Sequence, residues 1–207
     1  MQFLKITYCL SIVTVLLSLT ACGALLSGEV ERELIELKPG AYRLDPHHTT
    51  VLFKVGHLAV SDFVGRFNQA SAELDYNASD PADSQLRASV NLASLDVNRP
   101  DFADTLKSCD WLCTGRYPQA VFESQGRARR DGNSLVFPGF LDFRGVRKAV
   151  ELHVQINGAT TNRLTGNYTL GFEAHLLFNR SDFGMGQFIP AVGDAVRIEV
   201  YAEFIRR

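Results

Sequence analysis

The sequence contains little of what most enzymes and nucleic-acid-binding proteins need. Among its 207 residues, 21 Lys and Arg face 23 Asp and Glu, and the formal net charge is −2. Because no excess of positive charge is available to hold a phosphate backbone, we expect no nucleic-acid partner. The GxSxG, HExxH, P-loop and GxGxxG patterns, which are typical of hydrolase, metalloprotease and nucleotide sites, do not occur. We therefore expect no catalytic residues, no metal site and no cofactor.

Long apolar runs are missing except for one near the start. Residues 6–19 are mostly apolar, but this run is too short to span a bilayer comfortably and is placed as in a signal peptide. The letters LTAC at positions 19–22 follow it directly and resemble the lipobox of bacterial lipoproteins, in which the signal is cut before a cysteine that is then acylated. The resemblance implies that residues 1–21 are a lipoprotein signal peptide and that Cys22 is lipidated. Plain secretion with cleavage just beyond Ala24 is the alternative.

The residue after the expected lipidation site indicates where the protein is sorted. Gly23, and not an acidic residue, follows Cys22. By resemblance to lipoprotein sorting in Gram-negative cells, this implies a periplasmic protein held on the outer membrane by lipidated Cys22. Residues 22–40 would then form a charged tether, and residues 41–207 one domain with room for a sizeable core. The sequence does not indicate an oligomeric state.

Alternation of apolar and polar residues dominates this domain and predicts an all-β fold. The clearest stripes begin at Val51, Val150, Leu170 and Val196, and Gly, Asn, Asp and Pro separate the segments. Phe67 is out of phase with the stripe that follows it, which predicts a bulge near residues 68–69. Eight strands that are each apolar on one face favour either a closed barrel, which has no free edges, or a two-sheet sandwich. The pattern alone does not separate the two.

One segment breaks the alternation and predicts a single helix. Pro100 suits a first helical position, the residues Phe102, Leu106, Cys109 and Cys113 fall on one helical stripe, and Gly115 is a typical end. A lone amphipathic helix in an all-β domain would act as a lid at one end of the barrel.

Cysteine is scarce, with only four residues, and two of them remain after the signal is cut and Cys22 is acylated. An even pair in an oxidising compartment makes Cys109 and Cys113 a disulfide candidate. Two packed free thiols would fit the same positions. A thiol redox or copper-handling pair, with a histidine as third ligand, is a rival reading of the same residues.

Several stretches together resemble the YceI-like family of secreted lipid-binding proteins. They are LDPHHTTVLFKVGHL, GRFN, SLDVN, LKSCDWLCTGRYPQAVFES, GFLDFRGVRKAVEL, GFEAHLLFNRSDFGMG and VGDAVRIEV, in that order. The resemblance implies an extended, lipocalin-like, eight-stranded antiparallel barrel that holds a polyisoprenoid or another long-chain amphiphile, with no catalysis. It selects the barrel over the sandwich. Relatives often carry Arg-Asp-x-His-Leu where this chain has FADTL at positions 102–106, which favours a less anionic ligand, and they tend to lack the cysteine pair.

The inward-facing positions of the strands give the expected ligand-binding residues. We expect Leu106 of the lid helix and ten strand residues to line the lumen: Val51, Phe53, Val55, His57, Phe122, Leu141, Phe143, Phe172, Leu176 and Phe178.

The five histidines are given different roles. His57 shares a face with the valines of its strand, where it either orients a polar end of the ligand or hydrogen-bonds within the protein. For His48 we expect a hydrogen bond near Asp45 that orders the loop, and His47 is expected in solvent. His153 and His175 alternate outward and are expected on the surface.

These observations together predict a binding protein. An apolar lumen would bind a long chain, such as a polyisoprenoid, a lipid resembling an isoprenoid quinone, or a fatty-acid-derived lipid, because each buried methylene contributes roughly 0.8 kcal/mol. The protein would carry or store this lipid in the periplasm, with the lid helix admitting or releasing it. The redox or copper function is one alternative to lipid binding. A structural or interaction module, whose lumen is filled by its own side chains, is the second.

Overall fold

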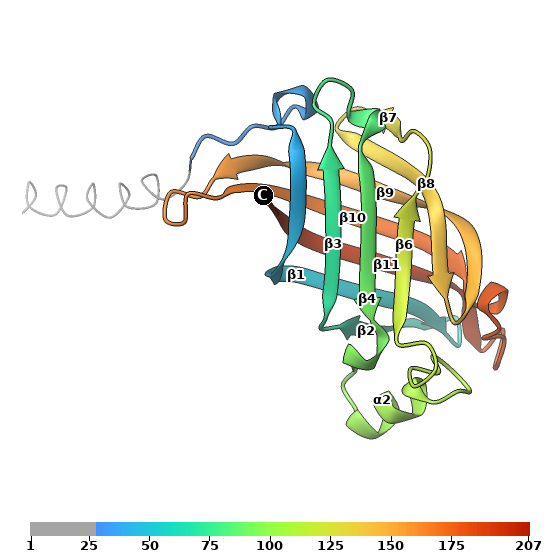
Figure 1. Cartoon of the computed structure of the whole chain (residues 1–207). Helices are drawn as coiled ribbons and strands as arrows, with labels where there is room; N and C mark the ends of the chain where they lie inside the picture. The colour runs from blue at the N-terminus through green and yellow to red at the C-terminus, as the bar shows by residue number, and fades with distance from the viewer. Residues whose placement is uncertain (1–27) are drawn as a thin grey trace, which may run out of the picture.

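The computed structural model describes residues 28–207, and one antiparallel sheet of eleven strands accounts for most of them (Figure 1). Its helices are α2 (Pro100–Lys107) and the 3-10 turns η1 (Leu34–Glu36), η2 (Pro81–Asp83), η3 (Leu92–Ser94) and η4 (Arg180–Phe183). The strands are β1 (Gly40–His57), β2 (Ser61–Phe67), β3 (Ala70–Tyr76), β4 (Gln85–Asn91), β5 (Leu95–Asp96), β6 (Gln119–Ser124), β7 (Arg129–Asp131), β8 (Ser134–Phe143), β9 (Val146–Thr161), β10 (Tyr168–Asn179) and β11 (Val192–Arg206).

The sheet closes on itself, so the fold is the expected barrel and not a sandwich. β11 pairs with β10 on one side and with β1 on the other, from Tyr42 opposite Arg206 to His57 opposite Val192. β1 pairs in turn with both β2 and β3, which follow each other along the chain and together form one of eight barrel strands. Closure leaves no exposed edge along this seam. The predicted irregularity at residues 68–69 is the break between β2 and β3.

Alternation within each strand separates the core from the surface, as the sequence predicts. In β10, Tyr168, Leu170, Phe172, Ala174 and Leu176 are buried, while the residues between them lie on the outer face. His153 and His175 lie on this outer face, opposite each other on β9 and β10, with their rings stacked at 4.7 Å between centroids.

The helix is shorter than expected. α2 begins at Pro100 but ends at Lys107, so the prediction that it continues to Gly115 is wrong. The chain turns back after the helix, because Leu112 N–H donates to the carbonyl of Leu106 and Cys113 has a positive φ of 53°. Cys109 and Cys113 form a disulfide within this turn, with their Cα atoms 3.8 Å apart, closer than the roughly 6 Å between positions four apart on a helix.

α2 lies at one end of the barrel, beyond the ends of β4 and β6 (Figure 1). Beyond its pairing with β1, β2 pairs only with the two residues of β5. The ring of Phe102 on α2 meets the ring of Phe63 on β2 edge-on, with 5.6 Å between centroids. The helix therefore lies where a lid is expected, and its opening stays a prediction. No helix within residues 28–207 is both long and apolar enough to cross a membrane.

The N-terminal segment closes the opposite end, which corrects the tether expected over residues 22–40. Glu31 pairs with Ala159, and Leu34 and Leu37 are completely buried. The Tyr76 hydroxyl donates to the Leu34 carbonyl at 2.6 Å. The segment has the charge of a tether, but its leucines fill the end of the barrel. Residues 22–27 and the signal peptide lie outside the described residues.

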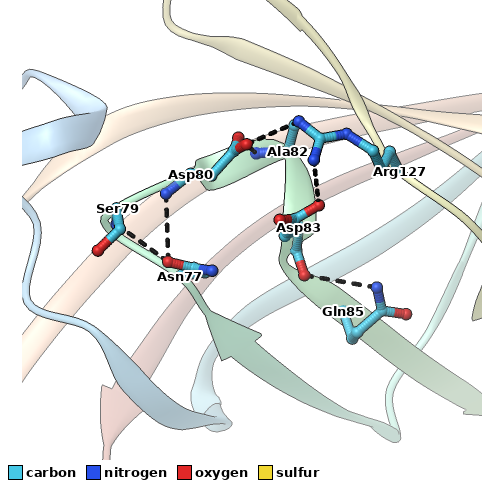
Figure 2. A network of polar contacts seen from close by, with 7 residues as sticks. All are labelled: Asn77, Ser79, Asp80, Ala82, Asp83, Gln85 and Arg127. Carbon is cyan, nitrogen blue, oxygen red and sulfur yellow. Dashed lines mark hydrogen bonds and ion pairs between the residues drawn. The ribbon is translucent and has the colours of Figure 1, made fainter.

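A polar network fixes the neighbouring loops at this closed end (Figure 2). Arg127, from the loop between β6 and β7, donates to Asp80 at 2.7 Å and to Asp83 at 2.6 Å, both in the turn between β3 and β4. Asn77 accepts backbone N–H groups from Ser79 and Asp80 in the same turn. These contacts tie two loops together without involving the barrel interior.

Candidate ligand-binding cavity

The barrel encloses a cavity of about 600 Å³, which is the size of pockets that hold small organic ligands. Side chains from all eight barrel strands, from α2 and from the turn after it form the wall, and most of them are apolar. Polar residues on the wall are Thr49, His57, Ser61, Asp62, Ser71, Ser89 and Arg180. Such a cavity favours an apolar occupant, because little of the wall can replace the hydrogen bonds of water.

Every residue expected to line the lumen lies on the wall of this cavity. The eleven positions are Val51, Phe53, Val55, His57, Leu106, Phe122, Leu141, Phe143, Phe172, Leu176 and Phe178. Their contact with a ligand stays a prediction.

Small residues that the sequence analysis did not select create much of the space. Ala70, Ala72, Ala88, Ala120 and Ala174 all line the cavity. Their inward parity follows from alternation, and their small size was the available signal. A large side chain such as that of phenylalanine fills a lumen, whereas an alanine leaves it open.

His57 lies at the mouth of the cavity and not deep inside it. It is the last residue of β1 and is exposed, as are its wall neighbours Ser61 and Asp62 at the start of β2. His57 therefore lines the cavity as expected, but it does so at the rim, because β1 ends there. Exposed wall residues mark this rim as the opening of the cavity.

Arg180 is a buried cation on the cavity wall that the sequence analysis missed. Its guanidinium donates to the carbonyls of Gly193 at 2.8 Å, Gln187 at 2.7 Å and Val192 at 2.9 Å, and also to that of Met185. Burial lowers the pKa of this side chain below its ordinary value. No short pattern marks it, since its partners are backbone atoms of the following loop.

The loops around the mouth are held together by polar contacts. Arg144, in the turn between β8 and β9, donates to the carbonyls of Phe183, Gly184 and Cys109. The disulfide expected between Cys109 and Cys113 is therefore part of the mouth. In this form neither sulfur is a free thiolate, which the copper-binding alternative requires.

His47 and His48 lie on the outside of the barrel, beside Asp45. At the irregularity between Leu44 and Thr49, the imidazole Nδ1 of His48 is 2.9 Å from Asp45 Oδ2, which confirms the expected loop-ordering contact. This hydrogen bond, together with the nearby Glu203 carboxylate, raises the pKa of His48 above its ordinary value. Exposed His47 donates its backbone N–H to Asp45.

Comparison with known proteins identifies the fold. The structure resembles BcnA of Burkholderia cenocepacia with a TM-score of 0.70 at 23% identity, covering 77% of this chain and 98% of BcnA. It also resembles a polyisoprenoid-binding domain from Saccharophagus degradans implicated in plant cell wall breakdown, with a TM-score of 0.60 at 15% identity, covering 82% of this chain and all of that domain. At these identities the likeness shows a shared fold.

Sequence comparison supports the same assignment. A UPF0312 protein of Shewanella baltica is 30% identical over 160 residues, which cover 77% of this chain and 83% of the relative. A UPF0312 protein of Shewanella oneidensis is 29% identical over the same shares. The model of the YceI-like domain matches residues 42–204, from the third residue of β1 nearly to the end of β11. With this match over the whole barrel, the chain belongs to the YceI-like domain family.

Proposed function

We propose that this protein binds a long-chain amphiphile in its barrel and carries or stores it in the periplasm. The observation that carries the proposal is the open, largely apolar cavity of about 600 Å³. A lumen filled by its own side chains would have favoured a structural module. Transfer of an alkyl or isoprenoid chain from water into this space gains roughly 0.8 kcal/mol for each methylene buried.

The type of ligand follows from the wall. Most side chains that line the interior are apolar, whereas the exposed polar residues His57, Ser61 and Asp62 lie at the mouth. A molecule with one polar end and a long apolar tail fits this division, since its tail occupies the lumen and its head stays near water. The polyisoprenoid named for the Saccharophagus domain has such a tail. A polyisoprenoid, a lipid resembling an isoprenoid quinone, or a fatty-acid-derived lipid is the proposed class.

Anchorage is a separate part of the proposal. The lipobox-like residues 19–22 support lipidation at Cys22 and attachment to the outer membrane. Mass spectrometry of the mature N-terminus tests it, because an acylated Cys22 and a free N-terminus beyond Ala24 have different masses.

The binding proposal is tested by lipid extraction from the full chain purified out of native membranes. Mass spectrometry of the denatured protein should find a long-chain lipid in near-stoichiometric amount. Ala174→Trp puts a large ring into the cavity and displaces about three or four methylenes of the tail, so affinity should fall about a hundredfold. Leu177→Trp on the outer face of the same strand is the matched control and should retain the lipid.

Two results would contradict the proposal. One is a series of lipid-free preparations in which the wild-type protein also fails to take up a fluorescent fatty acid. The other is equal lipid content in Ala174→Trp and Leu177→Trp, with both variants shown to be folded by circular dichroism. If Ala174→Trp does not fold, Ala72→Trp, which lines the cavity from β3, replaces it.

A further inference from the structure

Large apolar side chains are exposed around the mouth of the cavity. Leu58 is 58% exposed, Val60 81%, Phe188 68% and Ile189 40%. Leu58 and Val60 belong to the turn between β1 and β2, and the other two to the loop between η4 and β11. Exposed apolar residues scattered singly need no explanation, but a contiguous group marks an interaction site.

The two loops form one surface, which we call the apolar rim and define as Leu58, Val60, Phe188 and Ile189. Leu58 N–H donates to the carbonyl of Ala191 at 2.7 Å, which joins the turn to the loop. The Phe188 ring stacks on Trp111 with 6.1 Å between centroids and 17° between planes. Trp111 itself lines the cavity, so the apolar rim is continuous with the interior.

Three non-glycine residues in the two loops of the rim have a positive φ, a strained backbone conformation. Leu58 and Ala59 are the central residues of the turn His57–Val60, and both have positive φ, 53° and 56°. This is the combination of a type I′ turn, for which Asn-Gly is the preferred sequence. Phe188 also has a positive φ of 61°. If only the shape of the turn mattered, Asn-Gly would be the favoured sequence. The turn instead keeps apolar residues at a conformational cost, which indicates that these residues contact a partner.

We infer that the apolar rim docks the mouth of the cavity onto a lipid bilayer surface. The inference rests on the proposed function, because a long-chain guest is insoluble and must pass between a bilayer and the cavity. Binding to a membrane interface grows with the apolar area buried among the lipid headgroups, and the exposed side chains of the apolar rim offer such area. In Figure 1 the β1–β2 turn and the β10–β11 connection lie at one end of the barrel, and the described chain begins at the other.

Contact is tested on the full chain with Cys22→Ser, which leaves no acyl chain to hold the closed end on a membrane, and with phosphatidylcholine vesicles that contain brominated lipid, a quencher confined to the bilayer. An environment-sensitive dye is attached at Val60→Cys. The matched control carries the same dye at Leu164→Cys, which is 77% exposed in the turn between β9 and β10 at the closed end. The dye at position 60 should shift to the blue and be quenched severalfold more than the dye at position 164. Equal quenching at the two positions, or none at position 60, would overturn the inference.

A second variant separates docking from folding. Replacement of the turn by its preferred residues, Leu58→Asn with Ala59→Gly, removes an apolar side chain and relieves the strain. Thermal stability should not fall, while transfer of the bound lipid to acceptor vesicles should slow severalfold. An unchanged transfer rate in this variant counts against bilayer docking, and it would leave the binding proposal intact if the lipid content measured by mass spectrometry is normal.

Discussion

At the scale of single residues, a few polar side chains hold the mouth of the barrel in place. Arg180 is 3% exposed and uses four of its N–H donors on backbone carbonyls of residues 185–193. The bond to Met185 is buried and the other three are partly buried, so losing the donors leaves carbonyls without their partners. The guanidinium therefore orders the loop that carries Phe188.

Arg180→Lys keeps the positive charge but supplies fewer donors in the wrong geometry, so we expect it to lower the free energy of unfolding by about 3 kcal/mol. Urea denaturation followed by the fluorescence of Trp111, the single tryptophan, measures this. The control is Arg129→Lys, because Arg129 pairs with Glu151 on the exposed surface and should lose at most about 1 kcal/mol. An equal decrease in the free energy of unfolding in the two variants would show that the four carbonyl contacts contribute no more to stability than an exposed ion pair.

Two histidines should titrate on opposite sides of the ordinary value of 6.5. The hydrogen bond that the His48 imidazole makes to the Asp45 carboxylate raises the pKa of His48, whereas burial and the adjacent His153 lower the pKa of His175. Because the folded pKa of His48 is raised, its contact stabilises the loop below pH 6.5 and is lost as pH rises through the raised value. NMR titration of the imidazole resonances should show Asp45→Asn moving His48 toward 6.5 and leaving His175 unchanged.

At the scale of elements, η1 seals the barrel although it comprises three residues. Leu34 is 0% exposed and its neighbour Ile35 is 64% exposed, so the segment presents one side to the interior. The Tyr76 hydroxyl donates to Leu34 in this turn and the Tyr42 hydroxyl to Lys38 just after it, and burial raises the pKa of both phenols to about 12. The closed end is therefore built by the segment that precedes the first strand.

Leu34→Ala and Ile35→Ala form a matched pair on this element. Removal of the buried leucine side chain should destabilise the protein by about 2–5 kcal/mol, since a cavity is left behind. The exposed isoleucine should cost less than about 0.5 kcal/mol. Denaturant unfolding distinguishes them, and a negligible effect of Leu34→Ala would show that the segment is not part of the cooperative fold.

At the scale of the whole molecule, cavity and stability are coupled. An empty apolar cavity lacks the packing contacts that a guest supplies, and a ligand that binds only the folded state stabilises it in proportion to the logarithm of its concentration over Kd. The barrel that positions the lumen is held by its closed hydrogen-bond ladder, so the guest adds to a fold that is already complete.

We expect lipid removal to lower the melting temperature. A ligand present at about 100 times its Kd adds about 2.7 kcal/mol, which corresponds to roughly 5–10 °C for a domain of this size. Differential scanning calorimetry of the loaded and the delipidated chain measures the difference. Ala174→Trp, whose ring occupies part of the cavity, should show little change, and an identical melting temperature of loaded and delipidated wild type would argue against a guest in the lumen.

The sequence by itself determined the strands and their inward faces, because a side-chain period of two assigns each residue to one side of a strand wherever the pairing lies. That is why all ten of the expected strand positions line the cavity, whereas Leu106 reaches it from α2. Closure of the β1–β11 seam depends on contacts between segments some 150 residues apart. Alternation does not encode these contacts, and the barrel was expected only from the resemblance to a family. The tertiary structure alone decided the rest: that Leu34 fills the closed end, that α2 ends at Lys107, that His57 lies at the rim, and that Arg180 binds four carbonyls. Each of these features depends on contacts between a loop or chain end and residues far away in the sequence, and such contacts leave no pattern in the local sequence.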